Sequence, residues 1–289
     1  MQGIWLPLIT PFQDGRLDEG SLVKLLHRYL AAPIDGLILA ATTGEALTLD
    51  TQETERQVSL AAATAAGRLP IFLGLCGSDT RGVAHRIDTT RHWPIDGYLI
   101  TCPYYTRPSQ EGLRHHFTAL AACTDRPIAL YNIPYRTGVN LANDTLLRLA
   151  QLPNVIGVKD CCAIHAQSFE LLRRKPAGFS VMTGEDALFY SAIADGADGG
   201  ILASAHIDPE GFATTRNDLL GGNMKAARHR WGELADIVGL LFAEPSPAPI
   251  KYWLWREGWI ASPELRLPMT QVSDAPAARI TQLASRGRL

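Results

Sequence analysis

Short runs of apolar and β-branched residues alternate, along the first 220 residues, with longer stretches in which apolar residues recur every three or four positions. The short runs predict strands, and the longer stretches predict the helices that connect them. The predicted strands are residues 4–8, 36–40, 71–75, 97–101, 128–132, 155–159, 180–183 and 200–203. Eight such repeats favour a closed barrel, because open parallel sheets usually stop at five or six strands. The pattern therefore predicts an α/β fold, specifically a (β/α)8 TIM barrel.

After about residue 220 the strand signals end, and the remaining sequence is typical of helices. Three are predicted, at 225–242, 248–257 and 276–286, with a cluster of prolines between the first two. No G-x-G-x-x-G follows the first predicted strand, which disfavours a dinucleotide-binding sheet. We therefore expect a (β/α)8 catalytic barrel over residues 1–220 and a C-terminal helical appendage over 221–289, packed on the barrel.

Charge and cysteine content indicate which macromolecular partners and which cellular compartment to expect. In 289 residues, 27 Lys and Arg nearly balance 29 Asp and Glu, for a net charge of −2. Nucleic-acid grooves and membrane-surface helices need concentrated positive charge, so neither partner is expected. The chain shows no export-signal pattern and no apolar run of the roughly 18 residues that a membrane span needs. Five cysteines without C-x-x-C spacing favour free thiols in a reducing compartment, so we expect a cytoplasmic protein. The adjacent Cys161 and Cys162 are interpreted as small, partly buried residues.

Lys159 is the first candidate for chemistry. The chain has only five lysines against 22 arginines. Strand alternation over 155–159 places Val155, Gly157 and Lys159 on one face, expected to point into the barrel at its carboxyl-terminal rim. Burial favours loss of the proton from an ammonium group, and a neutral amine is a nucleophile that forms Schiff bases with carbonyl compounds. The alternative is an ion pair between Lys159 and a carboxylate such as Asp160 or Glu185. The other four lysines are interpreted as solvated or snorkelling side chains, namely Lys24, Lys175, Lys225 and Lys251.

Tyr131 and Arg136 lie on and just after the neighbouring predicted strand. Tyr131 is expected to point inward, where a phenol can pass protons to and from a reacting oxygen; the alternative is a core tyrosine with a satisfied hydroxyl. Arg136, in the turn that follows, is well suited to a bidentate grip on a carboxylate. A solvated surface arginine is the alternative there.

Hydroxyl groups also follow two other predicted strands. Thr42 and Thr43 can bind a carboxylate through hydroxyl and backbone N–H groups while one of them relays a proton. Tyr105 lies in an aromatic loop after the fourth predicted strand. It is predicted to be a site residue, an oligomer contact, or both.

Several segments together resemble the dihydrodipicolinate synthase family, within the N-acetylneuraminate lyase and class I pyruvate aldolase superfamily. They are TTGE at 42–45, PYYTRPSQEG at 103–112, YNIPYRTG at 131–138, GVKD at 157–160, EPSPAPIK at 244–251 and LRLPM at 265–269. The resemblance covers almost the whole chain. It implies a class I aldolase-type lyase that condenses pyruvate with aspartate 4-semialdehyde through a lysine Schiff base. The implied product is 4-hydroxy-tetrahydrodipicolinate, on the route to diaminopimelate and lysine.

The resemblance also implies a role for each candidate residue. Lys159 forms the imine with pyruvate, and Tyr131, Thr42 and Tyr105 form a proton relay, in which Tyr105 reaches into the site of a neighbouring subunit. The implied substrate-binding residues are Thr43 for the pyruvate carboxylate, Arg136 for the semialdehyde carboxylate, and the backbone of Gly184 and Ile201 along the pocket. No cofactor and no metal is implied. The implied assembly is a homotetramer, a dimer of dimers.

Three positions depart from the family pattern. Ala41 stands where the family usually has Gly, and Ala46 stands where it often has Ser. Tyr135 replaces a small residue before Arg136, which is expected to reshape the pocket for the second substrate. Residues 51–54 lack the histidine-containing stretch of lysine-inhibited members, so weak or absent inhibition by lysine is predicted.

Other functions are weighed against this one. A sister Schiff-base aldolase acting on a sugar-derived 2-oxo acid, of the N-acetylneuraminate or 2-keto-3-deoxy acid type, would share Lys159 and Tyr131, but Arg136 argues against it. A metal-dependent aldolase would need clustered ligands, whereas His115 and His116 point to different faces of a predicted helix and are expected to be solvated. A catalytically silent barrel serving as a binding protein would not need the Lys, Tyr and paired Thr set.

Overall fold

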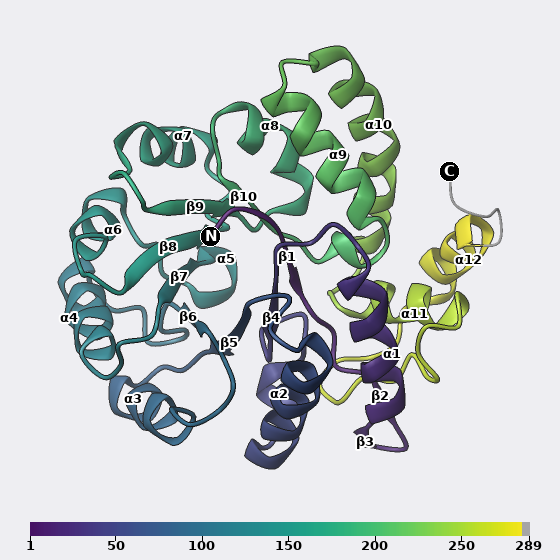
Figure 1. Cartoon of the computed structure of the whole chain (residues 1–289), viewed down its shortest axis with the longest axis horizontal. Coiled ribbons are helices and arrows are strands. Elements are labelled where there is room, and N and C mark those ends of the chain that lie inside the picture. The colour runs from purple at the N-terminus through teal and green to yellow at the C-terminus, as the bar shows by residue number, and fades with distance from the viewer. Residues whose placement is uncertain (285–289) are drawn as a thin grey trace.

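Eight parallel strands form a closed barrel in the computed structural model of the chain, which describes residues 1–284 (Figure 1). Around the barrel the neighbours follow the order β1, β10, β9, β8, β7, β6, β5 and β4. The strands are β1 (Gly3–Pro7), β4 (Gly36–Leu39), β5 (Ile71–Leu75), β6 (Gly97–Thr101), β7 (Ile128–Asn132), β8 (Val155–Asp160), β9 (Ser180–Thr183) and β10 (Gly199–Ile201). Every predicted strand is present, with its ends shifted by no more than two residues. The predicted (β/α)8 TIM barrel is confirmed.

The helices between the strands form an outer layer around the barrel, apart from the short α5, which lies near the centre of the view (Figure 1). They are α1 (Glu19–Leu30), α2 (Thr51–Ala65), α3 (Thr80–Thr89), α4 (Gln110–Ala121), α5 (Pro134–Thr137), α6 (Asn143–Leu149), α7 (His165–Arg174), α8 (Phe189–Ala194) and α9 (Pro209–Leu220). Short 3-10 turns lie at η1 (Ala46–Thr48), η2 (Asp186–Leu188) and η3 (Ser204–His206). Side chains cap the first turns of five helices by accepting backbone N–H groups. These caps are Asp18, Asp50, Asp79, Ser109 and Asp208.

Three further helices follow the barrel, α10 (Met224–Leu241), α11 (Ala248–Arg256) and α12 (Asp274–Ala284). The last was predicted at 276–286, and the final two of those positions lie outside the described residues. Helix α10 packs on α9. Helices α11 and α12 lie on the side of α1, where Lys24 Nζ donates a 2.6 Å hydrogen bond to the Gly258 carbonyl (Figure 1). Within residues 1–284 no helix has the length and apolar character needed to cross a membrane. The division at residue 220 stays a prediction.

A small hairpin outside the barrel was not predicted. Its strands, β2 (Phe12–Gln13) and β3 (Arg16–Leu17), have two residues each and pair in antiparallel register. Asp14 and Gly15 between them both have positive φ, 51° and 76°. An Asp-Gly pair is the favoured sequence for such a two-residue turn. The strands are too short to show any periodicity, so only the turn could have indicated them.

Strand alternation divides the buried side chains into an inner and an outer layer. The inner layer fills the barrel with residues from all eight strands, among them Trp5, Ile38, Phe72, Leu99, Tyr131, Met182 and Ile201. The outer layer joins the barrel to its helices. The prediction that Val155 faces inward is wrong. The register between β7 and β8 shifts between Ile128 and Ala129, so Val155 packs in the outer layer and Ile156 packs against the inner one.

Candidate active site

Lys159 and Tyr131 lie side by side near the carboxyl ends of β8 and β7. They are Cα partners in the parallel register, and Lys159 Nζ lies 4.5 Å from the centroid of the Tyr131 ring. Lys159 is 6% exposed and Tyr131 is 3% exposed. The fold therefore places an amine against a phenol in a largely dehydrated setting, at the end of the barrel where enzymes of this fold hold their sites.

Gly184, directly after β9, leaves the space that the Lys159 side chain occupies. A Cβ atom at position 184 would lie 2.3 Å from Lys159 Cε and 2.4 Å from Cys161 Sγ. Because carbon atoms in contact rest about 3.5–4.0 Å apart, only glycine fits beside this lysine conformation. Ile201, on β10, belongs to the same inner layer as Tyr131.

The carboxylates considered as ion-pair partners of Lys159 have other partners. Asp160 accepts hydrogen bonds from the Ser168 hydroxyl at 2.6 Å and from the Cys162 N–H at 3.1 Å. Glu185 accepts a 2.8 Å hydrogen bond from the Tyr135 hydroxyl. Lys159 is thus held near Tyr131 by the shape of the barrel interior, and its amine is not committed to either acid.

Burial raises the pKa of Tyr131 well above its ordinary value of 10, and Cys161 and Tyr135 add to this effect. Hydrogen bonding to Thr42 and the charge of Arg136 act in the opposite direction. The phenol therefore stays protonated at neutral pH. It can donate a proton or a hydrogen bond, and its contact with Thr42 provides a route by which a proton can be replaced.

A cavity of about 680 Å³ opens beside Tyr131, within the 300–1,000 Å³ range usual for small-molecule sites. The predicted site residues that line it are Thr42, Tyr105, Tyr131 and Arg136. Lys159, Thr43, Gly184 and Ile201 are not in its wall. Lys159 lies against the ring of Tyr131, and Tyr131 is part of the cavity wall. The structure thus gathers four predicted residues at the cavity, while Gly184 borders Lys159, Ile201 shares the inner layer with Tyr131, and Thr43 is buried next to Thr42.

Thr42 and Thr43 follow β4 in a tight turn. Thr42 is exposed, whereas Thr43 is only 7% exposed. The turn closes through backbone hydrogen bonds from the Gly44 N–H to the Ala41 carbonyl at 3.0 Å and from the Glu45 N–H to the Thr42 carbonyl at 3.1 Å. Adjacent threonines therefore have different surroundings, one at the cavity and one within the protein.

Arg136 and Tyr135 lie on the short helix α5, which runs from Pro134 to Thr137 and is followed by Gly138 with φ of 76°. Both side chains are exposed at the cavity. Burial of the hydroxyl, together with Cys161 and Glu185, raises the pKa of Tyr135 above its ordinary value of 10, so it remains a donor to Glu185. The departure noted at Tyr135 thus creates a contact between the segments after β7 and β9, which the sequence analysis did not foresee.

Tyr105 lies on the cavity wall with 89% of its surface exposed. Its φ is 70°, a conformation that costs energy for any residue with a Cβ atom. Its N–H donates a 3.1 Å hydrogen bond to the Thr137 carbonyl, which ties the loop to α5. The aromatic ring is therefore presented to solvent on a constrained backbone.

Two interpretations of charged residues are wrong. Lys251 is fully buried and forms an ion pair with Glu45, so it is neither solvated nor snorkelling. His116 is 5% exposed and bonds to Thr80 at 2.9 Å, whereas its neighbour His115 is exposed as expected. In the part of the chain that the structure describes, no group of three or more His, Cys, Asp or Glu side chains is arranged to hold a metal ion.

The sequence did not indicate that two buried groups, Cys161 and Asp186, lie near Lys159, although Cys161 was interpreted as a small, partly buried residue. Cys161 belongs to the inner layer, and burial raises its pKa well above 9. Asp186 is 4% exposed and accepts the Ser204 N–H at 2.6 Å, and burial raises its pKa to about 6. Adjacent cysteines and a single acidic residue after a strand are both common in sequences. The sequence pattern therefore could not indicate that Cys161 and Asp186 lie near the site.

The chain matches one protein family and many of its solved members. The profile of the Dihydrodipicolinate synthetase family matches residues 1–286. The chain is 43% identical over 274 residues to 4-hydroxy-tetrahydrodipicolinate synthase 2 of Clostridium acetobutylicum, covering 95% of this chain and 96% of the relative. It is 35% identical to 4-hydroxy-tetrahydrodipicolinate synthase of Desulfotalea psychrophila, covering 99% and 96%.

Solved structures agree with this match over nearly the full length. The crystal structure of dihydrodipicolinate synthase from Aquifex aeolicus superposes with a TM-score of 0.94 at 32% identity, covering 99% of this chain and 98% of the other. A structure described as the first monomeric dihydrodipicolinate synthase variant superposes with a TM-score of 0.95 at 29% identity, covering 99% and 96%. The similarity therefore includes both the barrel and the C-terminal helices.

Proposed function

The chain belongs to the dihydrodipicolinate synthetase family, and from this premise we propose that it is a class I aldolase-type lyase that condenses pyruvate with aspartate 4-semialdehyde. The product is 4-hydroxy-tetrahydrodipicolinate, on the route to diaminopimelate and lysine. The observation that carries this proposal is the position of Lys159 Nζ, 4.5 Å from the Tyr131 ring at the carboxyl-terminal end of the barrel.

Lys159 is the nucleophile of the proposed reaction. Its amine adds to the carbonyl carbon of pyruvate, the carbonyl oxygen leaves as water, and an imine forms. Loss of a methyl proton then gives an enamine, whose carbon attacks the aldehyde of the second substrate, and the aldehyde oxygen becomes a hydroxyl. The amino group of that substrate then adds to the imine carbon and displaces the Lys159 amine, which closes the ring and frees the lysine. The bulk of Lys159 is buried and Gly184 leaves its side chain room, which supports an amine held in one position for these steps.

Tyr131 and Thr42 carry protons in this proposal. Water formation needs a donor at the departing oxygen, and enamine formation needs an acceptor for a methyl proton. The raised pKa keeps the Tyr131 phenol protonated, so a proton is present at this position, and its hydrogen bond to Thr42 offers a path by which that proton is replaced. Tyr105 completes the relay from a second copy of the chain, which its 89% exposure allows. A dimer is the smallest assembly that allows this contact, and from the family resemblance we propose a homotetramer, a dimer of dimers, as the active form.

The carboxylates of the two substrates have separate partners. Thr43, at the turn after β4, binds the carboxylate of pyruvate, and the backbone at Gly184 and Ile201 lines its site. Arg136, exposed at the cavity wall, binds the carboxylate of aspartate semialdehyde through its guanidinium. A cavity of about 680 Å³ has room for both small acids.

A turnover assay tests the proposal. Wild-type protein with pyruvate and aspartate semialdehyde should give the cyclised product, and Lys159→Ala should lose this activity by at least three orders of magnitude. Lys225→Ala, at an exposed lysine of α10, is the matched control and should retain it. Turnover with sugar-derived 2-oxo acids and none with aspartate semialdehyde would favour the sister aldolase, and pyruvate binding without any turnover would indicate a binding protein.

A further inference from the structure

The turn that carries Thr42 and Thr43 is held in an uncommon backbone conformation. Ala40, at its start, has φ of 48°, and Glu45, at its end, has φ of 54°. Non-glycine residues persist in this region only where surrounding contacts determine the backbone. Gly44 lies so close to β1 that a Cβ atom there would be 2.9 Å from the Leu8 carbonyl oxygen. The conformation of the two threonines therefore depends on what holds the turn.

Three chain segments hold this turn, and the most distant in sequence is the C-terminal extension. From the segment after β1, the Thr10 hydroxyl donates a 2.7 Å hydrogen bond to the Gly44 carbonyl, and Gln57 on α2 donates to Thr10 at 2.8 Å. From the extension, Lys251 Nζ donates to one oxygen of the Glu45 carboxylate, and the Arg266 N–H donates to the other at 3.1 Å. Both oxygens of Glu45 are thus bound by residues more than 200 positions away.

Lys251 has no contact with solvent. It lies on α11 with its Nζ 4.3 Å from the centroid of the Phe12 ring, and it donates a second hydrogen bond to the Glu264 carbonyl at 2.7 Å. Burial lowers the pKa of Lys251 to about 8, while the charge of Glu45 raises it. An ion pair this deeply buried is costly to break, because removing one partner leaves the other charged and unpaired.

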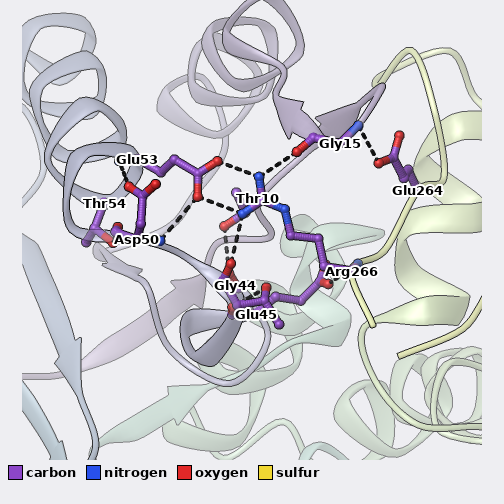
Figure 2. A network of polar contacts seen from close by, with 10 residues as sticks. Thr10, Gly15, Gly44, Glu45, Asp50, Glu53, Thr54, Glu264 and Arg266 are labelled. Carbon is purple, nitrogen blue, oxygen red and sulfur yellow. Dashed lines mark hydrogen bonds and ion pairs between the residues drawn. The ribbon is translucent and has the colours of Figure 1, made fainter. Parts of the chain in front are cut away.

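Arg266 extends the same connection to the start of α2. Its guanidinium binds both oxygens of Glu53 and donates to the carbonyls of Thr48 at 2.8 Å and Gly15 at 2.7 Å (Figure 2). Figure 2 shows Arg266 reaching from the C-terminal segment into the space between Gly15 and Glu53. Residues of the C-terminal extension therefore bind both the turn, through Glu45, and the segment that follows it, through Thr48 and Glu53.

We propose that Lys251 is a positioning residue, which through Glu45 fixes the turn that presents Thr42 and Thr43 to the substrate. This inference rests on the proposed function, since it assigns Lys251 to the same reaction. It makes helix α11 part of the framework of the active site. Lys251 itself lies outside the cavity wall and acts only through the turn.

The test uses wild-type protein, Lys251→Met, the double variant Glu45→Gln with Lys251→Met, and the exposed control Lys225→Met. Methionine keeps most of the apolar stem of lysine. In the double variant both charges of the buried pair are removed, so no unpaired Glu45 carboxylate remains. This variant therefore serves as the test protein if Lys251→Met alone does not fold. Two quantities are measured at saturating pyruvate, namely the fraction of Lys159 trapped by borohydride and the rate at which pyruvate methyl hydrogens exchange with D2O. A third, the KM for pyruvate, is obtained from exchange rates over a range of pyruvate concentrations.

Loss of the Lys251–Glu45 ion pair should displace Thr42, which slows proton transfer but leaves Lys159 in place. We expect methyl exchange in the double variant to fall at least tenfold, the trapped fraction to stay within twofold of wild type, and the KM for pyruvate to rise at least threefold. Lys225→Met should match wild type in all three. A purely structural role would lower exchange and trapping by one common factor, and that result, or exchange within twofold of wild type, would overturn the inference. Wild-type protein that shows neither trapping nor exchange would refute the proposed function instead.

Discussion

Gly184→Ala is the substitution that probes the packing around Lys159 most directly. The new Cβ atom would lie 2.3 Å from Lys159 Cε, 2.8 Å from Lys159 Cγ and 2.4 Å from Cys161 Sγ. To reach a contact of about 3.5 Å, Cε has to move by about 1.2 Å, unless the backbone moves instead. A shift of about 1 Å in a reacting group costs roughly 100-fold in rate. Overpacking a filled interior costs about 1–3 kcal/mol in stability.

We therefore expect Gly184→Ala to reduce kcat/KM for pyruvate by about 100-fold while the protein remains folded. Steady-state kinetics measure the loss, and urea unfolding separates it from the stability cost. Gly232→Ala is the matched control, because a Cβ placed there in α10 would meet nothing within 4 Å apart from the adjacent residues and the backbone of its own helix. This control should keep full activity and gain up to about 1 kcal/mol from helix propensity. Activity within twofold of wild type in Gly184→Ala would refute the account of how the barrel holds the lysine.

Four further expectations follow from the same structure. Tyr131→Phe should lower kcat by about 10²–10⁴-fold with Lys159 still in place, and a smaller loss in steady-state assays would argue against the relay. Arg136→Ala should raise the KM for aspartate semialdehyde by about 10–100-fold, the value of a charge-assisted contact, and leave the KM for pyruvate within twofold; equal changes in both would contradict its assignment. Lysine titrated into the assay should not inhibit at sub-millimolar concentration. His206 accepts the Ile9 N–H at 3.1 Å, and burial lowers its pKa to about 3. Because His206 binds a proton below about pH 6.5 in the unfolded chain and stays neutral in the folded protein, its contribution to the free energy of unfolding should fall by about 2 kcal/mol between pH 7 and pH 5. Urea unfolding at the two pH values measures this loss, and His206→Gln should not show it.

The barrel could be predicted because its strands produce strong local patterns. Buried parallel strands give short apolar runs, and their helices give a second period, so the eight strands were recognisable without tertiary information. Alternation also predicted the inward orientation of Tyr131, which the structure shows. It failed at Val155, because the β7–β8 register shifts next to it and no residue type marks such a shift.

The contacts that hold the site could not be predicted, because they join residues far apart in sequence. Lys251 looks like an ordinary helical lysine, and its burial depends on Glu45, more than 200 positions earlier. Tyr135 was noted as a departure, yet its bond to Glu185 required the relative placement of β7 and β9. Local pattern thus locates candidate chemistry, whereas the residues that position it depend on the closed barrel and on the extension that packs against it.

Borohydride trapping shows whether Lys159 forms an imine with pyruvate. Protein incubated with pyruvate and reduced should gain the mass of one reduced pyruvate adduct, and peptide mapping should locate it at Lys159. The same treatment without pyruvate, and of Lys159→Ala with pyruvate, should give no adduct at that position. An adduct on another lysine, or none at saturating pyruvate, would contradict the account.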